Sequence, residues 1–217
     1  MEHLYLTDDT QRGAALANLC LLESIGFCTP TREMAQGLAD GSFFSDLFDC
    51  LNALFPTDLR YAAYAYYGRD TEEIYHEINQ EYTRLFLSPK RELVPLYESL
   101  IVHPGEKVSM FINPTVMHCE QVYRKTGFAF EEKNKFPGDH VGIELRYFAC
   151  LLARRAMALE EGGEADAASC AAVMTEFAAQ HLARWVEKFA AQVTLHTQIP
   201  LYTALANALA KLATQFA

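Results

Sequence analysis

The chain has 217 residues, of which 51% are hydrophobic and 21% charged, and its formal net charge is −10. This length and composition are typical of a folded domain with a substantial core, and they exclude a disordered chain, which needs fewer apolar residues and denser charge. The acidic balance argues against nucleic acid, which requires a basic surface, and it suits a cationic partner.

Segments that direct a chain to a membrane are not evident. The N-terminus has no basic stretch followed by an apolar run, so no secretory signal is expected. No uncharged apolar stretch reaches the roughly 18 residues of a membrane span. The six cysteines form no CxxC pair and are expected to be free thiols in a reducing compartment. We therefore expect a cytoplasmic protein without an integral membrane segment.

The first quarter of the chain has helical periodicity. A polar residue within Asp8–Thr10 is expected to cap a first helix. Thr29-Pro30 supplies a cap and a first-turn proline for a second helix. Ser42 precedes an apolar run with the spacing of a third helix, and Pro56 is expected to end it.

The next elements are also predicted to be helices. Asp58 opens a tyrosine-rich helix that ends near Gly68. Thr71, followed by two acidic residues, begins another, which Ser88-Pro89 breaks. Pro95 marks an irregular or briefly helical segment.

The second half begins with a predicted helix over 115–126. Residues 127–138 are the most loop-like stretch, and we interpret them as a hinge. Asp139 is expected to cap the long apolar helix that follows, which ends at Glu160–Gly163. One further helix precedes Pro200, and the last helix follows it.

No alternating strand pattern of useful length is present. The expected fold class is therefore all-α, a single globular bundle of about nine or ten helices over the whole chain, with the hinge loop between two helical halves.

Candidate chemistry is sparse. Glu73-x-x-His76 has the spacing of half a di-iron site, but a second copy and two further carboxylates are missing. His140 and Glu144 share a helix face next to Asp139, a polar cluster that capping explains better than ligand binding. No nucleotide-binding loop or nucleophile motif occurs. We expect no catalytic residue, no metal and no cofactor.

Four tyrosines crowd the short helix before Gly68. They either floor a peptide groove or form half-buried core, and the core interpretation is favoured. They are Tyr61, Tyr64, Tyr66 and Tyr67.

Three stretches together resemble one family. The first is Glu81–Pro89 (EYTRLFLSP) followed by Pro95–Ser99 (PLYES), and the second is Phe136–Leu145 (FPGDHVGIEL). The third is the pattern HLxxWxxxF over 181–189, with Leu201-Tyr202 and Leu205-Ala206 following. In order and spacing they resemble the TorD/DmsD family of redox-enzyme maturation chaperones, which is related to the NarJ group. The resemblance spans roughly residues 70–217.

The resemblance implies an all-helical chaperone that is not an enzyme. Members of the family bind the twin-arginine leader, and often the body, of an apo molybdoenzyme of the dimethyl-sulfoxide-reductase type. They assist cofactor insertion and delay export. A monomer and a dimer swapped at the hinge are both compatible with it. Carried over by position, the leader-binding residues are Leu85, Phe86, Pro89, Pro95, Glu98, Ser99, Asp139, His140 and Glu144.

A leader has a cationic start and an apolar middle. We expect an apolar groove to take the middle. The carboxylates of Glu98, Asp139 and Glu144 are expected at its rim, where they pair with the two arginines.

Two alternatives stay open. One is a metal-dependent helical-bundle enzyme that uses Glu73, His76, His140 and Glu144. The other is an assembly adaptor that joins subunits without binding a leader.

Overall fold

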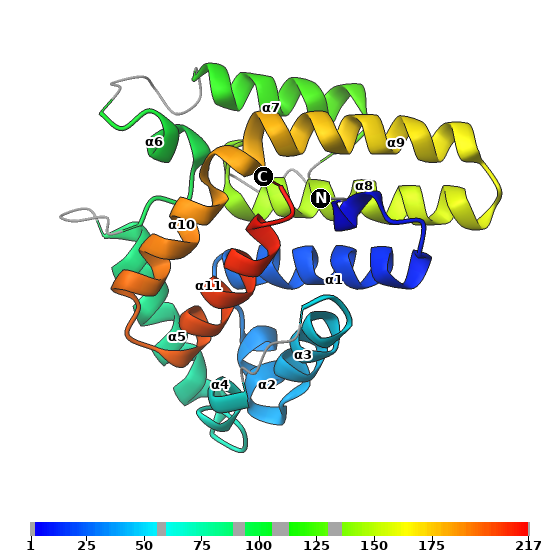
Figure 1. The fold of residues 1–217 in the computed structure, drawn as a ribbon. Coiled ribbons are helices and arrows are strands. Elements are labelled where there is room, and N and C mark those ends of the chain that lie inside the picture. The colour runs from blue at the N-terminus through cyan, green and yellow to red at the C-terminus, as the bar shows by residue number, and fades with distance from the viewer. Residues whose placement is uncertain (1–2, 56–59, 89–93, 106–112, 130–135, 217) are drawn as a thin grey trace.

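The computed structural model describes residues 3–55, 60–88, 94–105, 113–129 and 136–216, and within these ranges the predicted all-α fold is confirmed (Figure 1). No described helix is both long and apolar enough to cross a membrane. In chain order the elements are η1 Leu4–Leu6, α1 Thr10–Gly26, α2 Arg32–Asp40, α3 Ser42–Leu54, α4 Arg60–Tyr64, α5 Thr71–Tyr82, η2 Thr83–Leu87, α6 Glu98–Val102, α7 Pro114–Lys125, α8 Val141–Glu160, α9 Glu164–Phe177, η3 Ala178–Leu182, α10 Ala183–His196 and α11 Pro200–Ala213.

The core is built around α8. Helix α1 packs along one side of α8, and α9 packs along the other (Figure 1). Helix α11 packs on α10, and α3 extends the core below α1. The apolar stripe at spacings of four, three and four along α8 faces inward, because these side chains are all buried: Val141, Leu145, Phe148 and Leu152.

Local signals place most helix starts. Asp9 caps α1, since its carboxylate accepts hydrogen bonds from the amides of Gln11 and Arg12. The predicted start at Thr29-Pro30 is wrong: α2 begins at Arg32, and the Thr31 hydroxyl accepts from the Met34 amide (3.2 Å). Either threonine is an acceptable cap by residue type, so the sequence alone does not decide between them.

Two π turns interrupt the helices. η2 continues α5, and η3 joins α9 to α10, so that Glu164–His196 is one long helix with a π turn inside it. Such turns are rare and occur often at functional sites. Leu85 and Phe86 lie in the first and His181 in the second.

The predicted hinge at 127–138 lies between α7 and α8. Residues 130–135 lie outside the described residues, so the hinge stays a prediction. The end of the loop is tied to α7, because the Tyr123 hydroxyl donates to the carbonyl of Gly138 (2.8 Å).

Candidate functional site

Two of the motif segments, Pro95–Ser99 and Phe136–Leu145, lie side by side. The amide of Glu98 donates to the carbonyl of Asp139 (3.0 Å), and the amide of Val141 donates to the carbonyl of Leu96 (2.9 Å). The pairing forms an isolated antiparallel β-bridge. We call the paired segments 96–99 and 139–141 the junction. It fixes the start of α6 against the start of α8.

Asp139 does not cap α8, contrary to the prediction. Its Oδ2 accepts from the amide of Ser99 (3.0 Å), 40 residues away in sequence. The N-cap of α8 is His140, whose Nδ1 accepts from the amide of Gly142 (3.1 Å). Burial raises the pKa of Asp139. Its Oδ1 is buried without a hydrogen-bond partner among the described residues.

His140 is fully buried at the centre of the junction. Its ring stacks on Phe136 (centroids 4.3 Å apart) and meets Tyr97 edge-on (5.3 Å). Burial lowers its pKa to about 3, so the imidazole is neutral at physiological pH. Because Nδ1 accepts from Gly142, Nε2 carries the proton, and this atom has no partner within the described ranges.

Behind the junction, four side chains from four elements converge. Glu98 of α6, Cys119 of α7, Glu144 of α8 and His181 of η3 are all buried, and one potential ligand atom of each lies within 4.8 Å of the others. We call these residues the core cluster. Nδ1 of His181 lies 2.6 Å from Oε2 of Glu98 and 3.3 Å from Sγ of Cys119. That sulfur lies 3.9 Å from Oε1 of Glu144.

The core cluster concentrates acidic groups away from water. Desolvation, together with the charge of Glu98, raises the pKa of Glu144 well above its usual value. Desolvation and neighbouring carboxylates likewise raise the pKa of the Cys119 thiol. In the absence of a cation, the Glu144 carboxyl and the Cys119 thiol hold their protons, because burial away from water disfavours their charged forms.

Most of the predicted leader-binding residues are buried rather than exposed at the surface. Leu85 and Phe86 are core residues, and Pro95 is half-buried. Pro89 lies outside the described residues. Ser99 and the three carboxylates of Glu98, Asp139 and Glu144 are buried. The expectation that these carboxylates stand at an exposed rim is therefore wrong for this conformation.

Sequence reasoning does not single out Cys119 or His181. Cys119 has the apolar helical context of a core thiol, and His181 is one position of the HLxxWxxxF pattern. His181 and Trp185, one helical turn apart, both turn toward the two glutamates, but nothing in the sequence indicates where those glutamates lie.

The metal enzyme suggested by the sequence is not assembled. Glu73 and His76 are exposed on α5. The group of potential ligands found among the described residues contains Glu144 but neither of them, nor His140.

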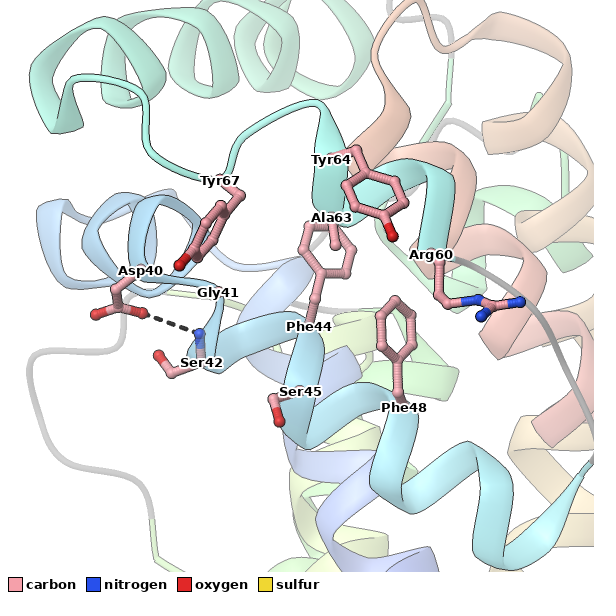
Figure 2. Close-up of a pocket in the computed structure, with 10 residues that line it drawn as sticks. All are labelled: Asp40, Gly41, Ser42, Phe44, Ser45, Phe48, Arg60, Ala63, Tyr64 and Tyr67. Carbon is pink, nitrogen blue, oxygen red and sulfur yellow. Dashed lines mark hydrogen bonds between the residues drawn. The ribbon is translucent and has the colours of Figure 1, made fainter.

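A second feature lies at the surface between α3 and α4. Figure 2 shows the rings of Phe44 and Phe48 on α3 facing Tyr64 on α4 across a hollow, with Tyr67 at its far end. The cavity has a volume of about 700 Å³. We call it the tyrosine pocket.

The exposure of the four tyrosines bears on the two interpretations of the tyrosine-rich helix. Tyr66 is fully buried, and Tyr61 is 47% exposed, so that about half of its surface is buried, as the core interpretation expects. Tyr64 and Tyr67 are 80% and 68% exposed, so the core interpretation is wrong for these two.

The lining of the tyrosine pocket carries one acidic and one basic residue, Asp40 and Arg60, and Asp46 and Asp49 are exposed on α3 outside the lining.

Comparisons with known proteins agree with the sequence motifs. The family model of the nitrate reductase delta subunit matches residues 52–191, more than half of the chain, which confirms the predicted resemblance. A crystal structure of a candidate redox enzyme maturation protein from Archaeoglobus fulgidus shares the fold, with a TM-score of 0.53 and 18% identity over 90% of this chain and 91% of that chain. A comparison with curated protein sequences gives no match.

Proposed function

The chain belongs to the family of the nitrate reductase delta subunit, and we propose that it is a cytoplasmic chaperone for the maturation of a redox enzyme. It binds the twin-arginine leader and the apo form of a molybdoenzyme of the dimethyl-sulfoxide-reductase type. It assists cofactor insertion, delays export and catalyses no reaction of its own.

The observation that supports this proposal most is the meeting of the motif stretches. Segments about 40 residues apart in the chain are joined by backbone hydrogen bonds and by the Asp139–Ser99 contact. The residues that carry the family resemblance therefore belong to one structural unit rather than to separate core positions.

The leader has two surfaces to contact. The predicted leader-binding residues, from Leu85 to Glu144, remain the proposed site, but the acidic side chains among them meet the leader's arginines only if the junction opens. The tyrosine pocket is accessible without any rearrangement. Its aromatic rings suit the apolar middle of a leader, and the carboxylate of Asp40 is the one acidic group in the lining that could meet the cationic start, with Arg60 also in the lining. We propose that the leader first docks there.

Isothermal titration tests the function. The ligands are twin-arginine leader peptides from molybdoenzymes encoded in the same genome. Matched peptides have both arginines changed to lysine, or the apolar core broken by a charge. Micromolar binding that both changes weaken supports the proposal. Absence of binding to every leader contradicts it, and binding to a leaderless apoenzyme instead would favour the assembly adaptor.

A further inference from the structure

The core cluster has the composition of a zinc site. Zinc in proteins takes thiolate, imidazole and carboxylate ligands, whereas magnesium and calcium take oxygen ligands almost alone. Glu98, Cys119, Glu144 and His181 offer one sulfur, one nitrogen and two carboxylate oxygens.

The distances also fit. Tetrahedral zinc with bonds of about 2.0–2.3 Å places its ligand atoms about 3.3–3.8 Å apart. The His181–Cys119 distance of 3.3 Å and the Cys119–Glu144 distance of 3.9 Å are near this range. The His181–Glu98 pair, at 2.6 Å, has to separate by roughly 1 Å or less.

Outer partners hold the remaining polar atom of each ligand side chain. His118 Nδ1 lies 2.8 Å from Nε2 of His181, so that Nδ1 of His181 is left for the ion. Trp185 Nε1 donates to Oε2 of Glu144 (3.0 Å). The guanidinium of Arg184 lies 3.4 Å from Oε1 of Glu98. Metal ligands in proteins are oriented by outer contacts of this kind.

The charges of the ligands and the ion also nearly balance. One thiolate and two carboxylates carry −3 against +2 for the ion, and the Arg184 guanidinium beside Glu98 offsets the remainder. Access is short, because two surface cavities, of about 130 and 450 Å³, are both lined by His118 and His181.

We propose that Glu98, Cys119, Glu144 and His181 bind one Zn²⁺ in a closed four-ligand site that fastens α6, α7, α8 and the π turn η3 together. Four protein ligands leave no open position, so the ion is structural rather than catalytic. While the ion is bound, Glu98 and Glu144 do not contact a leader, and Asp139 is the junction carboxylate left for its arginines.

Binding of Zn²⁺ replaces the protons held by the Cys119 thiol and the Glu144 carboxyl, and both protons leave to solvent. The hydrogen of the contact between His181 and ionised Glu98 moves from Nδ1 to Nε2 of His181, where Nδ1 of His118 accepts the hydrogen bond.

Cobalt(II) is the probe for this site, since it takes the same geometry and gives an absorption band when a thiolate binds it. The full-length protein, stripped with a chelator, is titrated with Co²⁺. We expect a thiolate band that saturates at one ion per chain and that Zn²⁺ removes. Cys119→Ser should lose the band, whereas Cys170→Ser, a half-buried thiol on α9, should keep it.

A measurement on the unchanged protein guards against a variant that does not fold. Zinc at about one hundred times its dissociation constant should raise the midpoint of thermal unfolding by roughly 5–10 °C. The proposal is overturned if no cobalt–thiolate band forms, if Cys119→Ser keeps the band, or if zinc leaves the midpoint unchanged.

Discussion

The tyrosine pocket makes a sharp prediction about leader binding. Tyr64 is 80% exposed, so replacing it leaves the core intact. If a bound leader covers about 80 Å² of its ring, burial contributes about 2 kcal/mol at 25 cal/mol per Å². Since 1.4 kcal/mol is tenfold in affinity, Tyr64→Ser should weaken leader binding roughly 10–30-fold.

Leu195→Ser is the matched control. Leu195 is 70% exposed on α10 and takes no part in the pocket, so its loss removes a similar exposed apolar side chain elsewhere. Both variants should unfold within about 1 kcal/mol of the unchanged protein, because exposed side chains contribute little to stability. Titration with the cognate leader then gives the answer. If Tyr64→Ser binds as tightly as Leu195→Ser, the pocket is not the docking surface.

Three further predictions concern the junction and the α1–α8 contact. Replacing Asp139 and His140 with alanine should weaken leader binding at least about tenfold, if the junction opens to meet the leader; unchanged affinity in calorimetry would remove these residues from the site. Glu23 is fully buried without a partner among the described residues, and desolvation holds its pKa well above the usual value. As the pH rises above the unfolded-state pKa, the unfolded chain loses this proton while the folded chain keeps it, so the folded state is destabilised. Relative to the unchanged protein, Glu23→Gln should therefore gain up to about 2.7 kcal/mol more stability at pH 7 than at pH 5 in denaturant unfolding. Equal gains at both pH values would contradict this. A methyl group on Gly142 would lie 2.7 Å from the sulfur of Cys28. Gly142→Ala should therefore lower the free energy of unfolding by about 1–3 kcal/mol. Gly13→Ala, with nothing within 4 Å of the added carbon, should not destabilise, and equal effects of the two changes on thermal unfolding would refute the packing argument.

Most helices could be predicted because their signals are local. Asp9 caps α1, Pro200 is the first residue of α11, and the Glu160–Gly163 stretch ends α8. Each of these outcomes depends on residues within one helical turn. The all-α fold class follows from the same local periodicity.

The predictions fail where a contact with a residue distant in the sequence determines the local structure. Asp139 is a good cap by type, but the amide of Ser99 takes its carboxylate, and the neighbouring His140 caps the helix instead. Glutamates are mostly exposed in proteins, so nothing in the sequence indicates that Glu98 or Glu144 is buried.

The core cluster could not have been predicted from spacing. Cys119 and His181 are 62 residues apart, and no short motif links them. The π turn adds a further obstacle, because one extra residue in a turn rotates the face on which His181 lies. A strict helical period of 3.6 therefore misplaces the His181 side chain, which lies in η3, relative to the faces of α9.

The closed junction is less stable than its burial suggests. A buried polar atom without a partner costs about 1–3 kcal/mol, and Oδ1 of Asp139 and Nε2 of His140 both lack one among the described residues. Water would satisfy both atoms if the junction opened. The two unpaired atoms therefore lower the free energy of exposing the residues that carry the family motif. Burial in the closed form and contact with a leader in an open form are compatible for this reason, since opening breaks the backbone pairs and the Asp139–Ser99 hydrogen bond while the two unpaired polar atoms gain partners in return.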